Sequence, residues 1–146
     1  MHVSRLSWAS FSLAIAGIAV ASYMVVIHYQ EHILVCGIGN CEKVQTSSYS
    51  EFKDILIAWF GFAMYLVILA LLVVREIRPA TEDVTSVALF GITLAGTIYV
   101  TYLTYLEIWV IEAICQWCVT FAIVTVLLFI ASLIRLWRLF ADGASE

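Results

Sequence analysis

Residues 113–134 read AICQWCVTFAIVTVLLFIASLI, a run of 22 residues without Asp, Glu, Lys or Arg. A helix rises about 1.5 Å per residue, so this run covers about 33 Å, close to the hydrocarbon thickness of a bilayer. Three further runs of at least 20 residues also carry no charged side chain: Leu6–Gln30, Ile55–Val74 and Val84–Leu106. The sequence therefore predicts four transmembrane helices, at about residues 7–29, 55–74, 84–106 and 114–135.

The composition of the whole chain agrees with this prediction. Of its 146 residues, 64% are hydrophobic and 12% are charged, whereas soluble chains are about half apolar and about a quarter charged. The net charge of -4 comes without a basic stripe that could follow a phosphate backbone. We therefore exclude a water-exposed enzyme domain, a disordered segment and a nucleic-acid binder. We expect residues 1–146 to form one all-α membrane domain, a four-helix bundle in the lipid bilayer.

The basic residues between the runs predict the orientation, because Lys and Arg close to a span stay on the cytoplasmic side. Five arginines fall on one side and two lysines on the other: Arg5, Arg75, Arg78, Arg135 and Arg138 against Lys43 and Lys53. We expect both termini in the cytoplasm, at the cell inner membrane, with the long first connection, about Glu31–Asp54, and the third connection outside. The first run is too long for the apolar core of a signal peptide, so we expect it to be retained.

All four cysteines fall on the expected outer side, where disulfides form and persist. Cys36 and Cys41 lie in the first connection, and Cys115 and Cys118 lie at the start of the fourth span. A single cysteine in an apolar protein usually packs as a small hydrophobe, but two close pairs on one side favour a redox function. One alternative is a non-enzymatic protein whose disulfides only staple its outer loops. Another is a zinc site, which is disfavoured because no prearranged loop orients four thiolates, so we expect no metal.

Cys115 and Cys118 have the more informative spacing. Helical residues three apart have Cβ atoms about 5–6 Å apart, whereas a relaxed disulfide prefers about 3.8 Å, so closing this disulfide distorts the helical turn. Such a disulfide exchanges readily, and a helix N-terminus stabilises a thiolate. We expect Cys115 to face water and Cys118 to lie about 4.5 Å deeper, which suits an electron relay into the membrane. Cys36 and Cys41, on either side of a glycine-containing segment, form either a mobile dithiol or a structural staple.

Three elements of the sequence occur together in one known family. They are the run Cys41-Glu-Lys-Val-Gln-Thr-Ser47, the pair Phe60-Gly61 early in the second span, and Cys115-x-x-Cys118 at the start of the fourth. In this combination the chain resembles the vitamin K epoxide reductase family (VKOR), in particular its bacterial and archaeal members. The resemblance covers about residues 8–134. It implies a four-helix bundle that holds a quinone, ubiquinone or menaquinone, beside Cys118.

The resemblance also implies a role for each site residue. Cys36 would exchange with a separate thioredoxin-like periplasmic protein, Cys41 would attack the Cys115–Cys118 disulfide, and the electrons would pass to the membrane quinone. This is the chemistry of a quinone-dependent disulfide oxidoreductase that supports disulfide bond formation. Ser47 would anchor the loop or form a hydrogen bond to the quinone, and the positions that correspond to the quinone pocket are Phe60, Met64, Leu103 and Ala122.

The chain departs from the family in ways that narrow the expected reaction. Ile57 and Ala122 stand where vertebrate members carry an Asn and a Tyr that donate hydrogen bonds, so we do not expect reduction of vitamin K epoxide. Cys36 and Cys41 are closer together than the loop cysteines of relatives usually are. Many bacterial relatives carry a fused thioredoxin-like domain. This chain ends at Glu146 without one, which predicts a separate partner protein.

A small four-span multidrug transporter is the competing class. Such a transporter would need an intramembrane carboxylate to couple proton movement to transport. We expect none in the four spans, because Glu107 and Glu112 fall in the short third connection. The distribution of charge therefore favours redox chemistry over transport.

Overall fold

The computed structural model describes residues 2–30, 37–45, 48, 51–52 and 55–144. Four long helices form its body: α1 (His2–Gln30), α3 (Ile57–Ile77), α4 (Glu82–Trp109) and α5 (Gln116–Gly143). The shorter elements are α2 (Cys41–Gln45), the 3-10 helix η1 (Pro79–Thr81) and two short antiparallel strands, β1 (Glu51–Phe52) and β2 (Ile55–Leu56). This architecture confirms the predicted all-α four-helix bundle.

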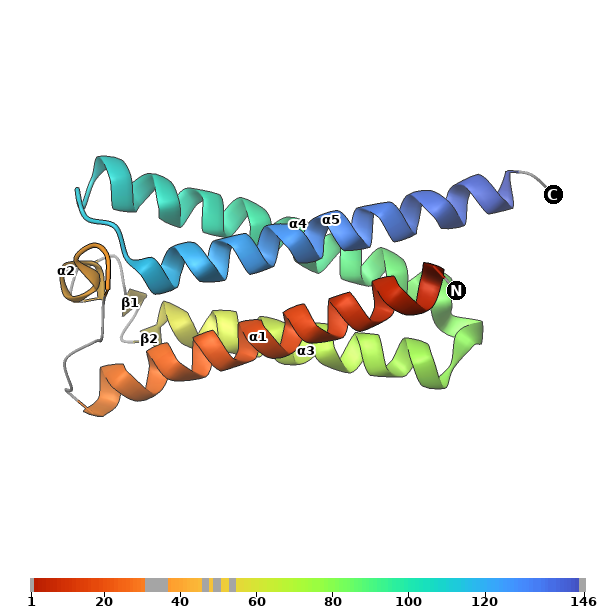
Figure 1. Cartoon of the computed structure of the whole chain (residues 1–146), viewed down its shortest axis with the longest axis horizontal. Helices are drawn as coiled ribbons and strands as arrows, with labels where there is room; N and C mark the ends of the chain where they lie inside the picture. The colour runs from red at the N-terminus through yellow and green to blue at the C-terminus, as the bar shows by residue number, and fades with distance from the viewer. Residues whose placement is uncertain (1, 31–36, 46–47, 49–50, 53–54, 145–146) are drawn as a thin grey trace.

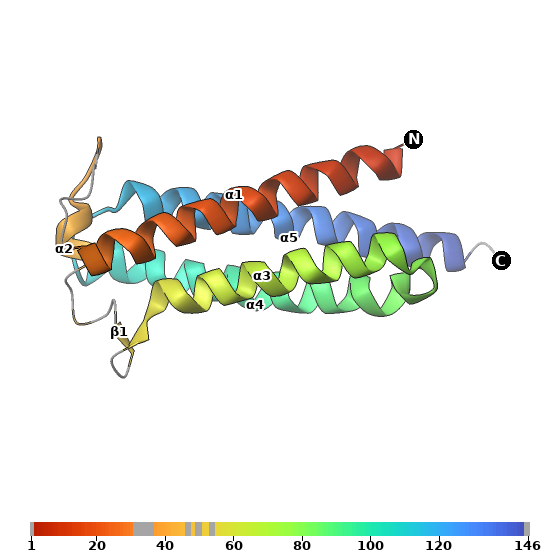
Figure 2. The same cartoon turned by 90° about the horizontal axis from the view of Figure 1, so that it is seen from below.

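The long helices run side by side along one axis, as two views at right angles show (Figures 1 and 2). α1 packs against α3 and α5, and α4 packs against the same two helices, which closes a ring of four. The start of α1 and the end of α5 lie at one end of the bundle (Figure 1). We call this the terminal end. α2 and β1 lie at the opposite end, which we call the cysteine end because Cys41 begins α2.

Each long helix is long and apolar enough to cross a membrane, over Arg5–Ile27, Ile57–Ile77, Pro79–Trp109 and Gln116–Gly143. The predicted number of spans is therefore confirmed, although the helices begin and end at other residues than predicted. α5 continues past Arg135 to Gly143, and α4 continues past Leu106 to Trp109. A charged residue need not end a helix, since an arginine can bury its aliphatic stem and a carboxylate can find hydrogen-bond donors.

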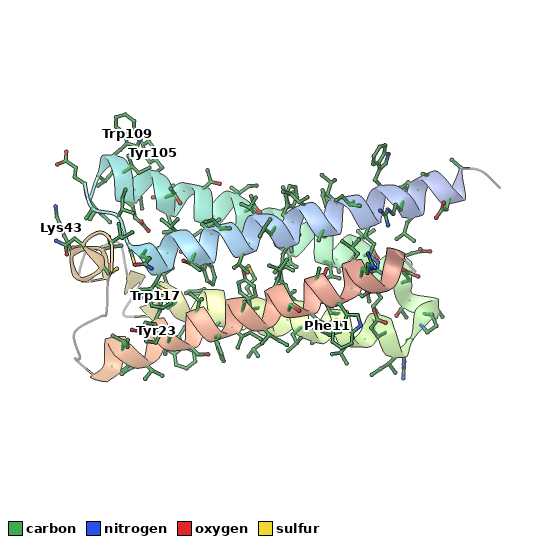
Figure 3. The ribbon with its side chains drawn as sticks, in the orientation of Figure 1. Phe11, Tyr23, Lys43, Tyr105, Trp109 and Trp117 are labelled. Atoms are coloured by element: carbon green, nitrogen blue, oxygen red, sulfur yellow. The ribbon has the colours of Figure 1, made fainter. Side chains whose placement is uncertain are left out.

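The outer surface of the bundle is apolar. Large side chains such as Trp8, Ile98 and Trp137 are 75%, 64% and 74% exposed. At the cysteine end, Tyr105 and Trp109 point away from the bundle (Figure 3). Aromatic residues near both ends and apolar side chains between them are typical of a surface in contact with lipid. The chain is a multi-pass membrane protein.

Small residues let the helices approach closely at the centre of the bundle. A Cβ at Gly17 of α1 would lie 2.0 Å from the ring of Tyr65, so only glycine allows this contact. Tyr65 of α3 is fully buried, and its hydroxyl bonds to the Thr125 hydroxyl of α5 at 2.9 Å. Close packing and such interhelical hydrogen bonds hold helices together where no water is available.

A cluster of polar side chains, here called the polar knot, joins the four helices at the terminal end; its two arginines and its serine are buried and its two glutamates reach the surface. It consists of Ser7, Arg75, Glu76, Glu82 and Arg135. Ser7 Oγ accepts hydrogen bonds from Arg75 at 3.3 Å and from Arg135 at 3.1 Å, and it donates one to Glu76 at 2.9 Å. Arg135 also lies 3.5 Å from Glu82. The two carboxylates thus compensate two guanidinium groups that lie almost entirely inside the bundle.

Candidate active site

Cys115 and Cys118 lie where the third connection becomes α5. Cys115 precedes the helix in an extended conformation (φ -102°, ψ 116°), and Cys118 lies in the first helical turn. Trp117, between them, packs on Tyr23 of α1 with ring centroids 4.6 Å apart (Figure 3). This contact fixes the first turn of α5 against α1. Both cysteines are thiols in this structure.

The expectation that Cys115 faces water is wrong. Its exposed fraction is 0%, whereas Cys118 is partly exposed. α2 lies over Cys115, and Cys41 and Val44 of α2 pack with Ala113 and Cys115 in one buried cluster. A sequence pattern cannot show this cover, because α2 lies far from Cys115 along the chain.

Cys41 is thereby brought to Cys115, the partner that the family resemblance implies. Cys41 is 1% exposed and takes part in a disulfide. Cys36 and Ser47, the other two predicted residues of the first connection, lie outside the described residues. Their roles stay predictions.

Backbone and side-chain contacts hold the segment before α2 against the start of α5. Gln116 Oε1 accepts hydrogen bonds from the amides of Gly37 and Ile38, each at 3.2 Å. The amide of Asn40 donates to Ile114 O at 3.0 Å, and Gly39 pairs with Cys115 in a β-bridge.

Two residues of this segment show why its sequence folds in this way. Gly39 has a φ of +94°, and a Cβ there would lie 2.1 Å from Ile114 O, so both its conformation and its surroundings require glycine. The Asn40 side chain accepts a hydrogen bond from Lys43 N at 3.2 Å and so caps α2.

The pKa of the Cys115 thiol is lowered to about 7. The largest cause is the hydrogen bond that the Cys118 thiol donates to the Cys115 sulfur, while burial acts in the opposite direction. The backbone amides of Trp117 and Cys118 also lower the pKa of Cys115, although the Cys115 sulfur does not cap the helix with a hydrogen bond. The charge of Glu107 opposes the shift. Cys115 is therefore the more easily ionised nucleophile, as a helix N-terminus predicts.

Glu107 is a site residue that the sequence analysis missed. It belongs to α4 rather than to the third connection, and it is only 5% exposed, so the expectation of spans without a carboxylate is wrong. Its Oε2 accepts a hydrogen bond from the amide of Cys115 at 3.3 Å, and its carboxylate shares the single hydrogen of the Cys118 thiol with the Cys115 sulfur. The signal in the sequence was a single acid directly after the apolar run Val84–Leu106.

A cavity of about 560 Å³ opens beside Cys118 among the long helices. Its walls are mainly apolar, and its polar groups include Glu107, Tyr99 and Thr104. The predicted pocket residues Phe60, Met64 and Leu103 line it; Ala122 is not among the lining residues.

The cavity has the volume and apolar lining typical of a small-molecule site, and a quinone ring with part of its tail fits this character. Among the described residues, no group of three or more His, Cys, Asp or Glu side chains could hold a metal ion.

A membrane bundle with a cysteine pair beside an apolar cavity is typical of a membrane-embedded thiol oxidoreductase. A model of the vitamin K epoxide reductase family matches residues 8–133, most of the chain. The chain belongs to this family, and family membership makes it a membrane thiol-disulfide oxidoreductase.

Proposed function

We propose that the chain carries electrons from a thioredoxin-like dithiol protein through Cys36 and Cys41 to Cys115 and Cys118, and from there to a membrane quinone. The cell would use this reaction to support disulfide bond formation. One observation carries the proposal. Cys115 packs against Cys41 under α2, whereas Cys118, one helical turn away, lines the apolar cavity. The pair therefore joins the loop cysteines to the cavity.

The exchange steps follow from this arrangement. The Cys41 thiolate attacks the Cys115 sulfur of the Cys115–Cys118 disulfide, and Cys118 leaves as a thiolate. Attack by Cys36 on Cys41 then releases Cys115 and closes the loop disulfide. The inner pair is left reduced, with two electrons to pass on. Cys41 takes part in a disulfide in the structure, and Cys115 and Cys118 are thiols, which supports this order of exchanges.

A quinone bound in the cavity would accept two electrons and two protons as the inner disulfide forms again. Phe60, Met64 and Leu103 would hold it by apolar contact beside Cys118. The direction of flow requires an acceptor of higher potential than the donor, and strong thioredoxin-like oxidants lie near about -120 mV. We propose a quinone as the electron acceptor rather than vitamin K epoxide as the substrate, because Ile57 and Ala122 supply no hydrogen-bond donors.

The proposed orientation places the cysteine end outside the cytoplasm, at the inner membrane. The excess of arginines at the terminal end supports it, since Arg75 and Arg135 both lie there. A separate thioredoxin-like protein would then reach the loop cysteines from the oxidising compartment.

Reconstitution tests the proposal. The purified protein is mixed with a short-chain ubiquinone or a menaquinone analogue and a reduced thioredoxin-like protein, and quinone reduction is followed by absorbance. Cys115→Ala and Cys118→Ala should each abolish turnover, whereas Thr101→Ala, at an exposed position of α4, should retain it. Wild-type turnover in either cysteine variant would refute the mechanism and favour a protein whose disulfides are only structural.

A further inference from the structure

Glu107 is a buried acid that the exchange steps above do not use. Among the described residues, no Lys, Arg or His forms an ion pair with it. Its hydrogen-bond donors are the Cys115 amide and the Cys118 thiol, both in the redox site. Burying a carboxylate without a cation is costly. A neutral glutamine could accept the same hydrogen bond from the Cys115 amide. A purely structural role at the Cys115 backbone therefore does not explain why residue 107 is a glutamate.

Its position links the thiol to the cavity. Glu107 lines the cavity together with Cys118, and it is the only carboxylate among the described residues that do so. The tyrosine and threonine hydroxyls that share the cavity, Tyr99 and Thr104, are weak bases, and Thr104 already donates to Val100 O at 2.9 Å. The Cys115 sulfur also accepts the Cys118 thiol hydrogen, but it becomes part of the disulfide and cannot keep the proton. Glu107 is therefore the good acceptor that remains within hydrogen-bond reach.

We propose that Glu107 is a catalytic residue that accepts the proton of the Cys118 thiol as the Cys115–Cys118 disulfide forms, and then releases it into the cavity. The inference rests on the proposed function. Oxidation of two thiols to one disulfide releases two electrons and two protons, and the electron acceptor takes up the two electrons and the two protons. Cys115 and Cys118 each lose one proton, and Glu107 carries the one from Cys118.

The other proton needs no such carrier. At neutral pH, a thiol whose pKa is about 7 is already about half ionised. Cys115 can therefore lose its proton before the disulfide forms. Cys118, which faces apolar walls, depends on the nearby carboxylate.

The test needs no quinone. In the full chain carrying Cys36→Ser and Cys41→Ser, only Cys115 and Cys118 remain as thiols. The small oxidant diamide closes their disulfide and is itself reduced to the hydrazine. Acid quenching at successive times, followed by thiol counting, gives the rate of closure. Glu107→Gln should slow closure about 10²-fold, because general acid–base catalysis contributes at least about that much. Glu107→Asp, which keeps a carboxylate, should lose less.

Two controls separate proton transfer from a structural role. Glu112→Gln removes an exposed acid from the connection that follows α4, and its disulfide should close at the rate of the parent protein, which carries only Cys36→Ser and Cys41→Ser. In Glu107→Ala, added formate should restore part of the closure rate, since a small carboxylate can enter the space left by the side chain. Closure in Glu107→Gln at the parent rate, or the absence of rescue by formate in a folded Glu107→Ala protein, would overturn the proposal. Because the assay contains no quinone, its result is independent of whether the chain reduces quinones.

Discussion

Gln116 offers the most direct test of how the loop covers the redox site. Its side-chain oxygen accepts two hydrogen bonds, from Gly37 N and Ile38 N, each at 3.2 Å and exposed to solvent. Such bonds are worth about 0.5 kcal/mol each, so Gln116→Ala should weaken loop docking by about 1 kcal/mol and raise the undocked population about fivefold. Cys115 is 0% exposed, so a maleimide reaches it only when the loop opens. The alkylation rate should therefore also rise about fivefold.

The assay uses a Cys118→Ser background, in which Cys115 is the reactive thiol and its neighbour still donates a hydrogen bond. Alkylation is followed by mass spectrometry at fixed pH. Gln116→Glu provides the matched control, because a carboxylate accepts the same two amides and should keep Cys115 protected. Equal alkylation rates in Gln116→Ala and the background protein would refute the reasoning, as would a Gln116→Glu variant as reactive as Gln116→Ala.

Three further predictions follow from single contacts. Gly39→Ala places a Cβ on the Ile114 carbonyl and a left-handed φ on alanine, which together cost at least about 1–2 kcal/mol, so alkylation of Cys115 should rise at least about fivefold. The alkylation rate of Cys115 should be half-maximal near pH 7, the pKa of its thiol. Cys118→Ala removes the main hydrogen-bond donor to the Cys115 sulfur and should move that midpoint to higher pH. An unchanged midpoint would contradict the role of Cys118 in lowering the pKa. Gly17→Ala drives a Cβ into the Tyr65 ring and should lower the free energy of unfolding by about 1–3 kcal/mol, measured by thermal or denaturant unfolding in detergent.

The sequence predicts the helices of this protein well, because the length and apolarity of a run are local properties that a bilayer selects directly. The ends of the helices are less predictable. α4 includes Glu107, since the Cys115 amide and the Cys118 thiol, at the start of α5, satisfy its carboxylate inside the bundle. A rule based on charge alone does not anticipate these donors. The same limit explains why the burial of Cys115 was missed.

In the candidate site too, the features that depend on neighbouring residues could be predicted from the sequence, and the features that depend on distant residues could not. The spacing of Cys115 and Cys118 indicates a redox pair because residues three apart are neighbours on one face of a helix. The hydrogen bond between Gln116 and Gly37 joins positions 79 residues apart, and only the folded chain brings them together. The pocket positions lie between these cases: Phe60, Met64 and Leu103 line the cavity, but nothing in their local pattern distinguishes them from ordinary packing residues.

The polar knot at the terminal end has a consequence for the depth of the redox site. Ser7 accepts from both Arg75 and Arg135, so a lengthwise slide of α1, α3 or α5 by one residue would break at least one of these hydrogen bonds inside the bundle. The knot therefore fixes the longitudinal register of these helices. Because α5 also carries Cys118, contacts at one membrane surface determine how far below the other surface the sulfur lies.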